Sequence, residues 1–164
     1  MKNSLFEPHN LLPSDGKAIN HGPIFSVEES DQFFTKLMSG LPWRSDVIKM
    51  FGKTITTTRK VAWVGDGGLD YTYSGATKCP LPWTALLTQL KNRVEEQIGE
   101  SFNSCLLNLY HDGGEGMSWH RDNETTINPH TPITSPSFGA KRRFHFKHIE
   151  TNERITTDRD HCSL

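Results

Sequence analysis

The segment Cys105-Leu106-Leu107-Asn108-Leu109-Tyr110 is predicted to be a β-strand with two different faces. Successive side chains of a β-strand point to opposite faces, so the odd-numbered, mostly aliphatic residues share one face. Asn108 and Tyr110 share the other face, where an amide and a phenol point the same way. Taken alone, such a pair is more often hydrogen-bonded within a sheet than used to bind a ligand.

The next polar block follows a glycine-rich loop, residues 112–116, which is predicted to be flexible. It reads Trp119-His120-Arg121-Asp122-Asn123-Glu124. In an extended segment His120 and Asp122 project from the same face, because they are two positions apart. Two histidines and one carboxylate form a facial site for Fe(II) that leaves positions open, and this pair would supply two of those three ligands. His-x-Asp triplets also occur as surface pairs or as a histidine oriented by an aspartate.

The flanking sequence predicts an α+β fold, in which helices support many short strands. Ser26 and Glu29 form a capping box before an apolar stripe, which predicts a helix over residues 27–38. A second stripe at helical spacing, ended by Gly99, predicts a helix over residues 84–98. The predicted strands are residues 61–64, 69–73, 104–110, the neighbours of His120, 133–138 and 143–148.

A glycine cluster, Gly65-Asp66-Gly67-Gly68, separates the predicted strands 61–64 and 69–73. Glycine supplies the positive φ that tight hairpin turns require. The cluster contains neither a GxGxxG pattern nor a Walker pattern with its lysine. It is therefore interpreted as the turn of a hairpin that joins the two strands, not as a phosphate-binding loop.

Length and composition indicate one soluble, folded domain. The chain has 164 residues, of which 34% are hydrophobic and 23% charged, and its formal net charge is -1. It has no apolar run of the roughly 20 residues that a membrane helix needs, and its start does not resemble a secretory signal. The three cysteines lack zinc-site spacing. Residues 1–25 are predicted to be a loose arm and residues 26–164 the domain.

Several blocks taken together resemble the AlkB-like 2-oxoglutarate- and Fe(II)-dependent dioxygenases. The similarity covers residues 26–150 in order and is greatest for the branch that repairs duplex DNA. The blocks that carry it are Phe51-Gly52-Lys53, Arg59-Lys60, Tyr71-Thr72-Tyr73-Ser74-Gly75, Asn108-Leu109-Tyr110, His120-Arg121-Asp122-Asn123-Glu124 and Ser137-Phe138-Gly139-Ala140-Lys141-Arg142-Arg143-Phe144.

This resemblance implies a double-stranded β-helix core, the jelly roll of cupin-like proteins, with supporting N-terminal helices. It implies oxidative demethylation of N-alkylated DNA bases, in duplex or single-stranded DNA, with Fe(II), 2-oxoglutarate and O2. His120 and Asp122 would be catalytic iron ligands. Asn108 and Tyr110 would bind 2-oxoglutarate.

The resemblance also implies a set of DNA-contacting residues. Tyr71, Tyr73 and Glu124 would line the pocket for a flipped base, and Arg59 would lie near the DNA backbone. Phe51 would be wedged into the base stack, which offsets the cost of extruding a base; the alternative is a buried core aromatic. Further cations would either contact phosphates or form a solvated strand edge: Lys141, Arg142, Arg143 and Lys147.

The family places a second iron-binding histidine and two arginines beyond the region that this sequence matches. The histidines after Asp122 are His130, His145, His148 and His161, and none is assigned as the third ligand. The expected domain is therefore incomplete at its C-terminus. The alternatives are an inactive homologue that binds damaged DNA and a nonfunctional fragment. A monomer without membrane or protein partners is expected inside the cell, in the cytoplasm of a bacterium or the nucleus of a eukaryote.

Overall fold

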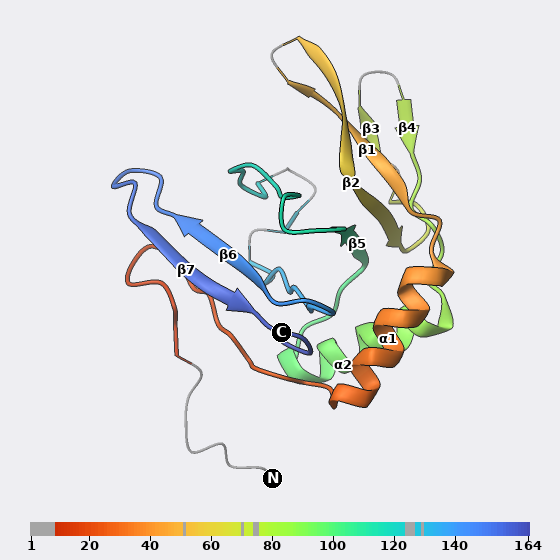
Figure 1. Ribbon diagram of the computed structural model, residues 1–164, viewed down its shortest axis with the longest axis horizontal. Coiled ribbons are helices and arrows are strands. Elements are labelled where there is room, and N and C mark those ends of the chain that lie inside the picture. Colours follow the sequence, from red (N-terminus) through yellow and green to blue (C-terminus); the bar gives the residue numbers. More distant parts are fainter. Residues whose placement is uncertain (1–8, 51, 70, 74–75, 124–126, 129) are drawn as a thin grey trace. The chain divides into compact units, whose positions relative to one another are not determined.

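The computed structural model describes residues 9–50, 52–69, 71–73, 76–123, 127–128 and 130–164 (Figure 1). The chain forms two compact units, residues 37–132 and residues 1–36 with 133–164. As predicted, the fold is α+β, and β1 to β7 pair in antiparallel fashion within the described residues. Its elements are α1 (Val27–Gly40), β1 (Arg44–Met50), β2 (Lys53–Gly65), β3 (Tyr71–Tyr73), β4 (Ala76–Lys78), α2 (Ala85–Ile98), β5 (Ser104–Leu109), β6 (Arg142–Lys147) and β7 (Arg154–Arg159).

A three-stranded sheet organises the unit of residues 37–132. Its strand order is β1-β2-β5, so the long strand β2 lies in the centre (Figure 1). The ladder between β2 and β5 places Val61 opposite Asn108 and Val64 opposite Cys105. The predicted strand 104–110 is therefore confirmed as β5, within one residue at its end.

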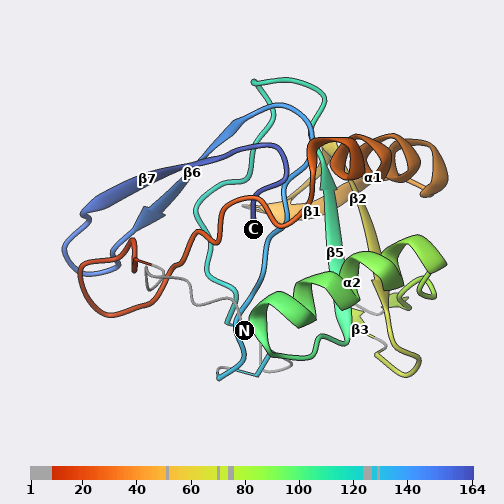
Figure 2. The same cartoon turned by 90° about the horizontal axis from the view of Figure 1, so that it is seen from below.

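Helix α2 lies beside this sheet in both views (Figures 1 and 2). Thr84 caps its start by accepting a hydrogen bond from the Leu87 N–H at 3.2 Å, and Gly99 ends it with a φ of 81°. The apolar stripe of α2 is buried, as are Ala62 and Val64 of β2. The predicted second helix and its core face are thus confirmed.

The hairpin predicted between residues 61–64 and 69–73 is wrong in its pairing. β2 pairs with β1 on one side and β5 on the other, so both of its edges are taken. β3 instead pairs with β4, with Tyr71 opposite Lys78. Residues 65–68 do make a turn, in which Gly68 has a φ of 87°, but the strand after it does not pair with β2.

An aromatic cluster forms the core of the unit made by residues 1–36 and 133–164. The ring centroids of Phe25 and Phe33 are 5.0 Å apart, and Phe138 lies within 6 Å of both rings. The capping box of α1 is present, because Glu29 accepts from the Ser26 N–H at 2.8 Å and Ser26 Oγ accepts from the Glu29 N–H. Phe25 belongs to the predicted loose arm and is buried.

Two of the predicted strands are absent from the described residues. Residues 133–138 form none, because Pro136 cannot donate a ladder hydrogen bond. Ser137 makes two backbone hydrogen bonds there, to Ser163 and Cys162, at 2.9 and 3.0 Å. Residues 117–123 around His120 also have no strand partner in the described part of the chain.

The strand predicted over residues 143–148 is confirmed as β6, which pairs with β7. β7 was not predicted, although the β-branched run Ile155-Thr156-Thr157 would have indicated a strand. None of the helices in the described residues combines the length and apolar character that a membrane crossing requires.

We expect Gly139→Ala to destabilise the protein more than Gly22→Ala. Both glycines have a positive φ, 89° and 70°, so each substitution should cost about 1 kcal/mol for the left-handed backbone. A Cβ at Gly139 would lie 2.9 Å from Phe34, whereas one at Gly22 would meet nothing within 4 Å. The extra cost at Gly139 should be about 1 kcal/mol, measured by urea unfolding. Equal losses would contradict the close approach of Phe34.

We also expect one rapidly reacting thiol in the folded chain. Cys79 is exposed and Cys162 is buried, and burial raises the pKa of the Cys105 thiol to about 11. Because the thiolate is the nucleophile, a disulfide reagent at pH 8 should modify one equivalent quickly. Cys79→Ser should remove that phase. Fast reaction of two or more thiols in the folded protein would show that Cys105 or Cys162 is not shielded from the reagent.

Candidate functional site

His120 and Asp122 lie close together, as the sequence predicts. His120 Nε2 is 3.5 Å from Asp122 Oδ1, and the two side chains are 50% and 47% exposed. His120 Nδ1 lies 2.9 Å from the Ser118 carbonyl oxygen. A carbonyl only accepts, so Nδ1 carries a proton, and in the neutral imidazole Nε2 is left with its lone pair. One nitrogen and one carboxylate donor therefore face a common, open position.

This donor pair fits two positions of an Fe(II) site. Imidazole nitrogen and carboxylate oxygen are the ligand types of the facial iron centres of oxygenases. The hydrogen bond to the Ser118 carbonyl favours the His120 tautomer in which Nε2 could bind a metal ion. Among the described residues, however, no group of three histidine, cysteine, aspartate or glutamate side chains lies together. The described part of the chain thus brings together two side chains of a suitable ligand type, and not a complete site.

Strand β5 presents Asn108 at an open position of the sheet. Exposure alternates along β5, with Asn108 exposed and its neighbours Leu107 and Leu109 less so. Tyr110 follows the last residue of the strand. The alternation predicted for this segment is therefore confirmed, and its even-numbered face is the more open one.

A buried cation lies next to Asn108. Arg59 of β2 is 5% exposed, and its guanidinium donates to Asn108 Oδ1 and pairs with Asp46 Oδ2 at 3.0 Å. Asp46 is on β1, so the three side chains form a row across β1, β2 and β5. Asp46 was not predicted from the sequence, because no local pattern marks Arg59 as its partner.

The loop between β5 and His120 is fastened near its middle by Glu115. The carboxylate accepts from the His111 N–H at 2.7 Å and lies 3.0 Å from His111 Nδ1. Thr58 of β2 also hydrogen-bonds it. These hydrogen bonds, the backbone N–H of His111 foremost, lower the pKa of Glu115. The loop predicted to be flexible is therefore attached to the sheet.

The residues predicted to contact DNA are only partly described. Phe51 and Glu124 lie outside the described residues. Tyr71 and Tyr73 are on β3, where the structure describes the backbone pairing and not the side chains. Their predicted roles stay predictions, as does that of Arg59, whose guanidinium is held inside the sheet.

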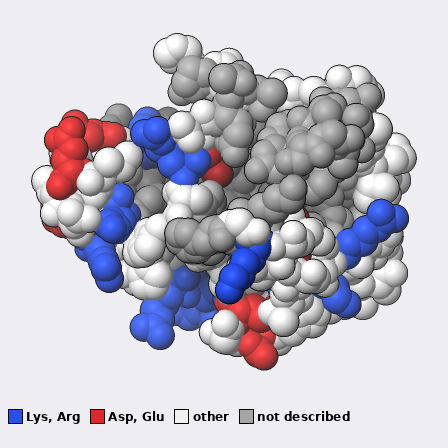
Figure 3. Space-filling model, turned by 90° about the horizontal axis from the view of Figure 1, so that it is seen from above, with Lys and Arg blue, Asp and Glu red and all other residues white. Residues whose placement is uncertain are grey.

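The predicted basic cluster is partly neutralised within the protein. Lys141 Nζ lies 2.8 Å from Asp158 and 3.3 Å from Asp160, and these hydrogen bonds raise the pKa of Lys141. On the face drawn in Figure 3, the described cations and acids form several separate patches. The predicted phosphate contacts of this cluster therefore stay a prediction. Lys141 already has two carboxylate partners within the protein.

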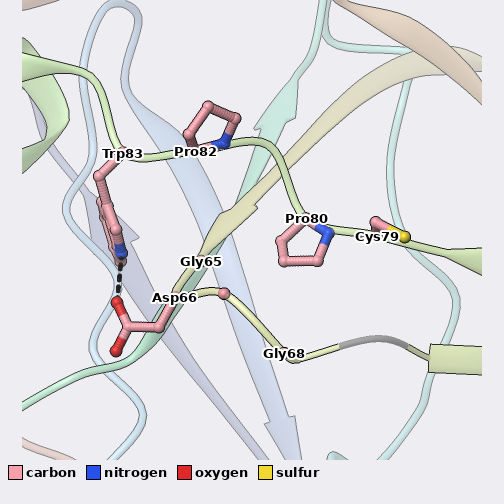
Figure 4. Close-up of a pocket in the computed structure, with 8 residues that line it drawn as sticks. Gly65, Asp66, Gly68, Cys79, Pro80, Pro82 and Trp83 are labelled. Atoms are coloured by element: carbon pink, nitrogen blue, oxygen red, sulfur yellow. Dashed lines mark hydrogen bonds between the residues drawn. The ribbon is translucent and has the colours of Figure 1, made fainter.

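The glycine turn after β2 borders a hollow of about 590 Å³ (Figure 4). Asp66 Oδ1 accepts from Trp83 Nε1 at 2.7 Å across it, and the prolines that precede Trp83 form another wall. An aspartate at this position does not suit a phosphate. Among the described residues that line the hollow there is none of the predicted site residues.

The histidines near the end of the chain make contacts within their own unit. His161 Nδ1 accepts from the Gly139 N–H at 2.9 Å, and His161 Nε2 is 3.4 Å from Asp31. His148 Nε2 is 3.1 Å from Asp15. Both imidazoles therefore contact protein groups of their own unit in this structure.

We expect Glu115→Gln to weaken the acid dependence of stability. The folded-state pKa of Glu115 is lowered, so its contribution is present above the unfolded-state pKa and is lost as the pH falls through the folded-state pKa. Thermal unfolding between pH 7 and pH 3 should show a smaller decline in Tm for the variant than for the wild type. Glu96→Gln on the exposed face of α2 is the control. An unchanged decline would mean that the Glu115 contacts do not contribute.

Comparison with known proteins identifies the family of this chain. The model of the 2OG-Fe(II) oxygenase superfamily matches residues 18–161. DNA oxidative demethylase ALKBH2 is 38% identical over 143 residues in Mus musculus and 35% identical in Homo sapiens, covering 85% of this chain. Alpha-ketoglutarate-dependent dioxygenase alkB homolog 3 of Bos taurus is 38% identical over 74% of it. The chain spans 60%, 55% and 42% of the lengths of these relatives. Its long family match shows that the chain belongs to the 2OG-Fe(II) oxygenase superfamily.

Proposed function

We propose that this chain contributes to the oxidative removal of N-linked methyl groups from DNA bases. The observation that carries the proposal is the pairing of His120 Nε2 with Asp122 Oδ1 at 3.5 Å, in the same compact unit as Asn108 and Tyr110. The relatives named DNA oxidative demethylase support DNA as the substrate. We further propose that the complete domain has a jelly-roll core and acts as an intracellular monomer.

The roles of the residues follow from their chemistry. His120 and Asp122 would hold Fe(II), which together with 2-oxoglutarate and O2 supplies the oxidising chemistry when bound. Asn108 and Tyr110 would donate hydrogen bonds to the keto acid, because an amide N–H and a phenol are suitable donors to carboxylate oxygen. The protein thereby orients the cosubstrate relative to the base.

DNA recognition is proposed for residues that lie before and after the segment 108–122 in the sequence. Tyr71, Tyr73 and Glu124 would surround an extruded base, and Phe51 would fill the gap that it leaves. Extrusion is required because an enzyme cannot reach the target atom of a base that is stacked inside a duplex. Alkylated DNA, single-stranded or duplex, is thus the proposed partner.

A second candidate is a homologue that binds damaged DNA without turnover. It is favoured by one observation, namely that the described residues contain no group of three ligating side chains. With two protein ligands, iron would be held weakly, because affinity depends on the number of ligands. Turnover separates the two candidates.

The test is release of succinate and formaldehyde from an N-methylated oligonucleotide. The wild type should release both only when Fe(II) and 2-oxoglutarate are present, and His120→Ala and Asp122→Asn should each reduce the rate by more than about 100-fold. His145→Ala is the control, since His145 Nδ1 contacts Thr156 on β7 at 2.8 Å and is outside the proposed site.

Absence of turnover in a cooperatively folded wild type would overturn the enzymatic proposal for this chain. Tighter binding of methylated than unmethylated duplex in that case would favour the second candidate. Equal binding of both duplexes would argue against the second candidate too.

A further inference from the structure

We infer that Arg59 is a positioning residue, which fixes the side-chain amide of Asn108 so that its N–H groups face the keto-acid position. The inference rests on the proposed function, because that function assigns Asn108 to 2-oxoglutarate. It gives Arg59 a role inside the protein in place of the predicted contact with the DNA backbone.

The first observation is the burial of Arg59 and the identity of its partners. The Arg59 side chain is 6% exposed, and that of Asp46 is 24% exposed. A buried guanidinium is stable only when a counter-charge and hydrogen-bond acceptors surround it. Asp46 supplies the charge at 3.0 Å, and Asn108 Oδ1 supplies an acceptor. Such an enclosed cation has little access to a phosphate group in solution.

The second observation is an irregularity of the sheet that directs these side chains. The register of β1 against β2 shifts between Ser45 and Val47, so Asp46 lies at a β-bulge. Bulges redirect side chains and occur next to active sites. Thr57 fastens this bulge, because its Oγ1 accepts from the Asp46 N–H at 3.1 Å and donates to the Arg59 carbonyl at 2.7 Å. Both ends of the ion pair are thus fixed by backbone hydrogen bonds.

Asp46 is held at both of its oxygens. Oδ1 accepts from the Val47 N–H at 3.0 Å, while Oδ2 faces Arg59. The carboxylate therefore cannot turn away from the guanidinium without breaking one of these bonds. A rigid acid on β1 holds Arg59, and Arg59 in turn holds the amide on β5.

The consequence for Asn108 follows from the two ends of an amide. One end is a carbonyl oxygen, which accepts, and the other is an NH2 group, which donates twice. With Oδ1 turned toward Arg59, Nδ2 points away from the cation. A carboxylate or keto oxygen requires a donor, whereas a flipped amide would present an oxygen and repel it. Arg59 thereby selects the orientation that binds an anionic cosubstrate.

The inference is tested first without any cosubstrate. In the full chain, the side-chain amide signals of Asn108 are identified by NMR from their loss in Asn108→Ala. Arg59→Met should shift or broaden them, because it removes both guanidinium donors. Lys60→Met is the matched control, since Lys60 is the next residue of β2 and lies opposite Leu109. Unchanged Asn108 signals in Arg59→Met would overturn the inference.

A double variant separates positioning from a simple loss of charge balance. Arg59→Met leaves the Asp46 carboxylate without its cation. Arg59→Met combined with Asp46→Asn removes the carboxylate as well, so no uncompensated charge is left. If Arg59 positions Asn108, the amide signals should stay altered in the double variant. Their return to wild-type values would mean that Arg59 only neutralises Asp46, which overturns the inference.

The second readout is 2-oxoglutarate affinity in the presence of Mn(II), followed by tryptophan fluorescence. Arg59→Met should bind roughly tenfold more weakly, with partial recovery in Arg59→Lys and no change in Lys60→Met. Unchanged 2-oxoglutarate affinity in Arg59→Met would overturn the inference that Arg59 helps Asn108 to bind the keto acid. If the wild type itself binds no 2-oxoglutarate, the proposed function and Asn108's cosubstrate role fail, and the amide signals alone decide whether Arg59 holds Asn108.

Discussion

The antiparallel pairing of β2 with β5 determines which side chains act together in the unit of residues 37–132. A shift of one residue in a strand register moves every side chain to the opposite face. The observed register puts Asn108 opposite Val61 and leaves Val64 opposite Cys105, so the amide is on the open face and Val64 is buried. The position of the proposed cosubstrate residue is therefore tied to the packing of the core beneath it.

Two anchors link this sheet to the proposed site. One is the row from Asp46 through Arg59 to Asn108, which crosses all three strands. The other is Glu115, which attaches the loop after β5 to β2 through Thr58. Both anchors use charged groups with several hydrogen bonds, which are stronger than bonds between neutral groups. The residues proposed to bind iron and 2-oxoglutarate thus depend on polar contacts as well as on the apolar core.

Local sequence patterns predicted the local structure well. The capping box before α1, the apolar stripe of α2 and the alternation of β5 each involve residues a few positions apart. The approach of His120 to Asp122 is also local, and it holds although the segment has no strand partner in the described residues. Strand pairing is not local, which is why the partner of β2 was wrong. Asp46 was missed for the same reason, since 13 residues separate it from Arg59.

The attachment at Glu115 has a consequence for how the chain between Tyr110 and His120 tolerates changes in length. It divides one long connection into two shorter spans, each closed by fixed ends. The entropic cost of closing a flexible segment rises only slowly with its length. Added residues therefore change the free energy of folding little when both ends of the segment stay in place. Insertions among residues 112–114 would enlarge the first span alone, and the number of residues between Glu115 and His120 would stay the same. Length variation among related chains should therefore concentrate on that side of the anchor.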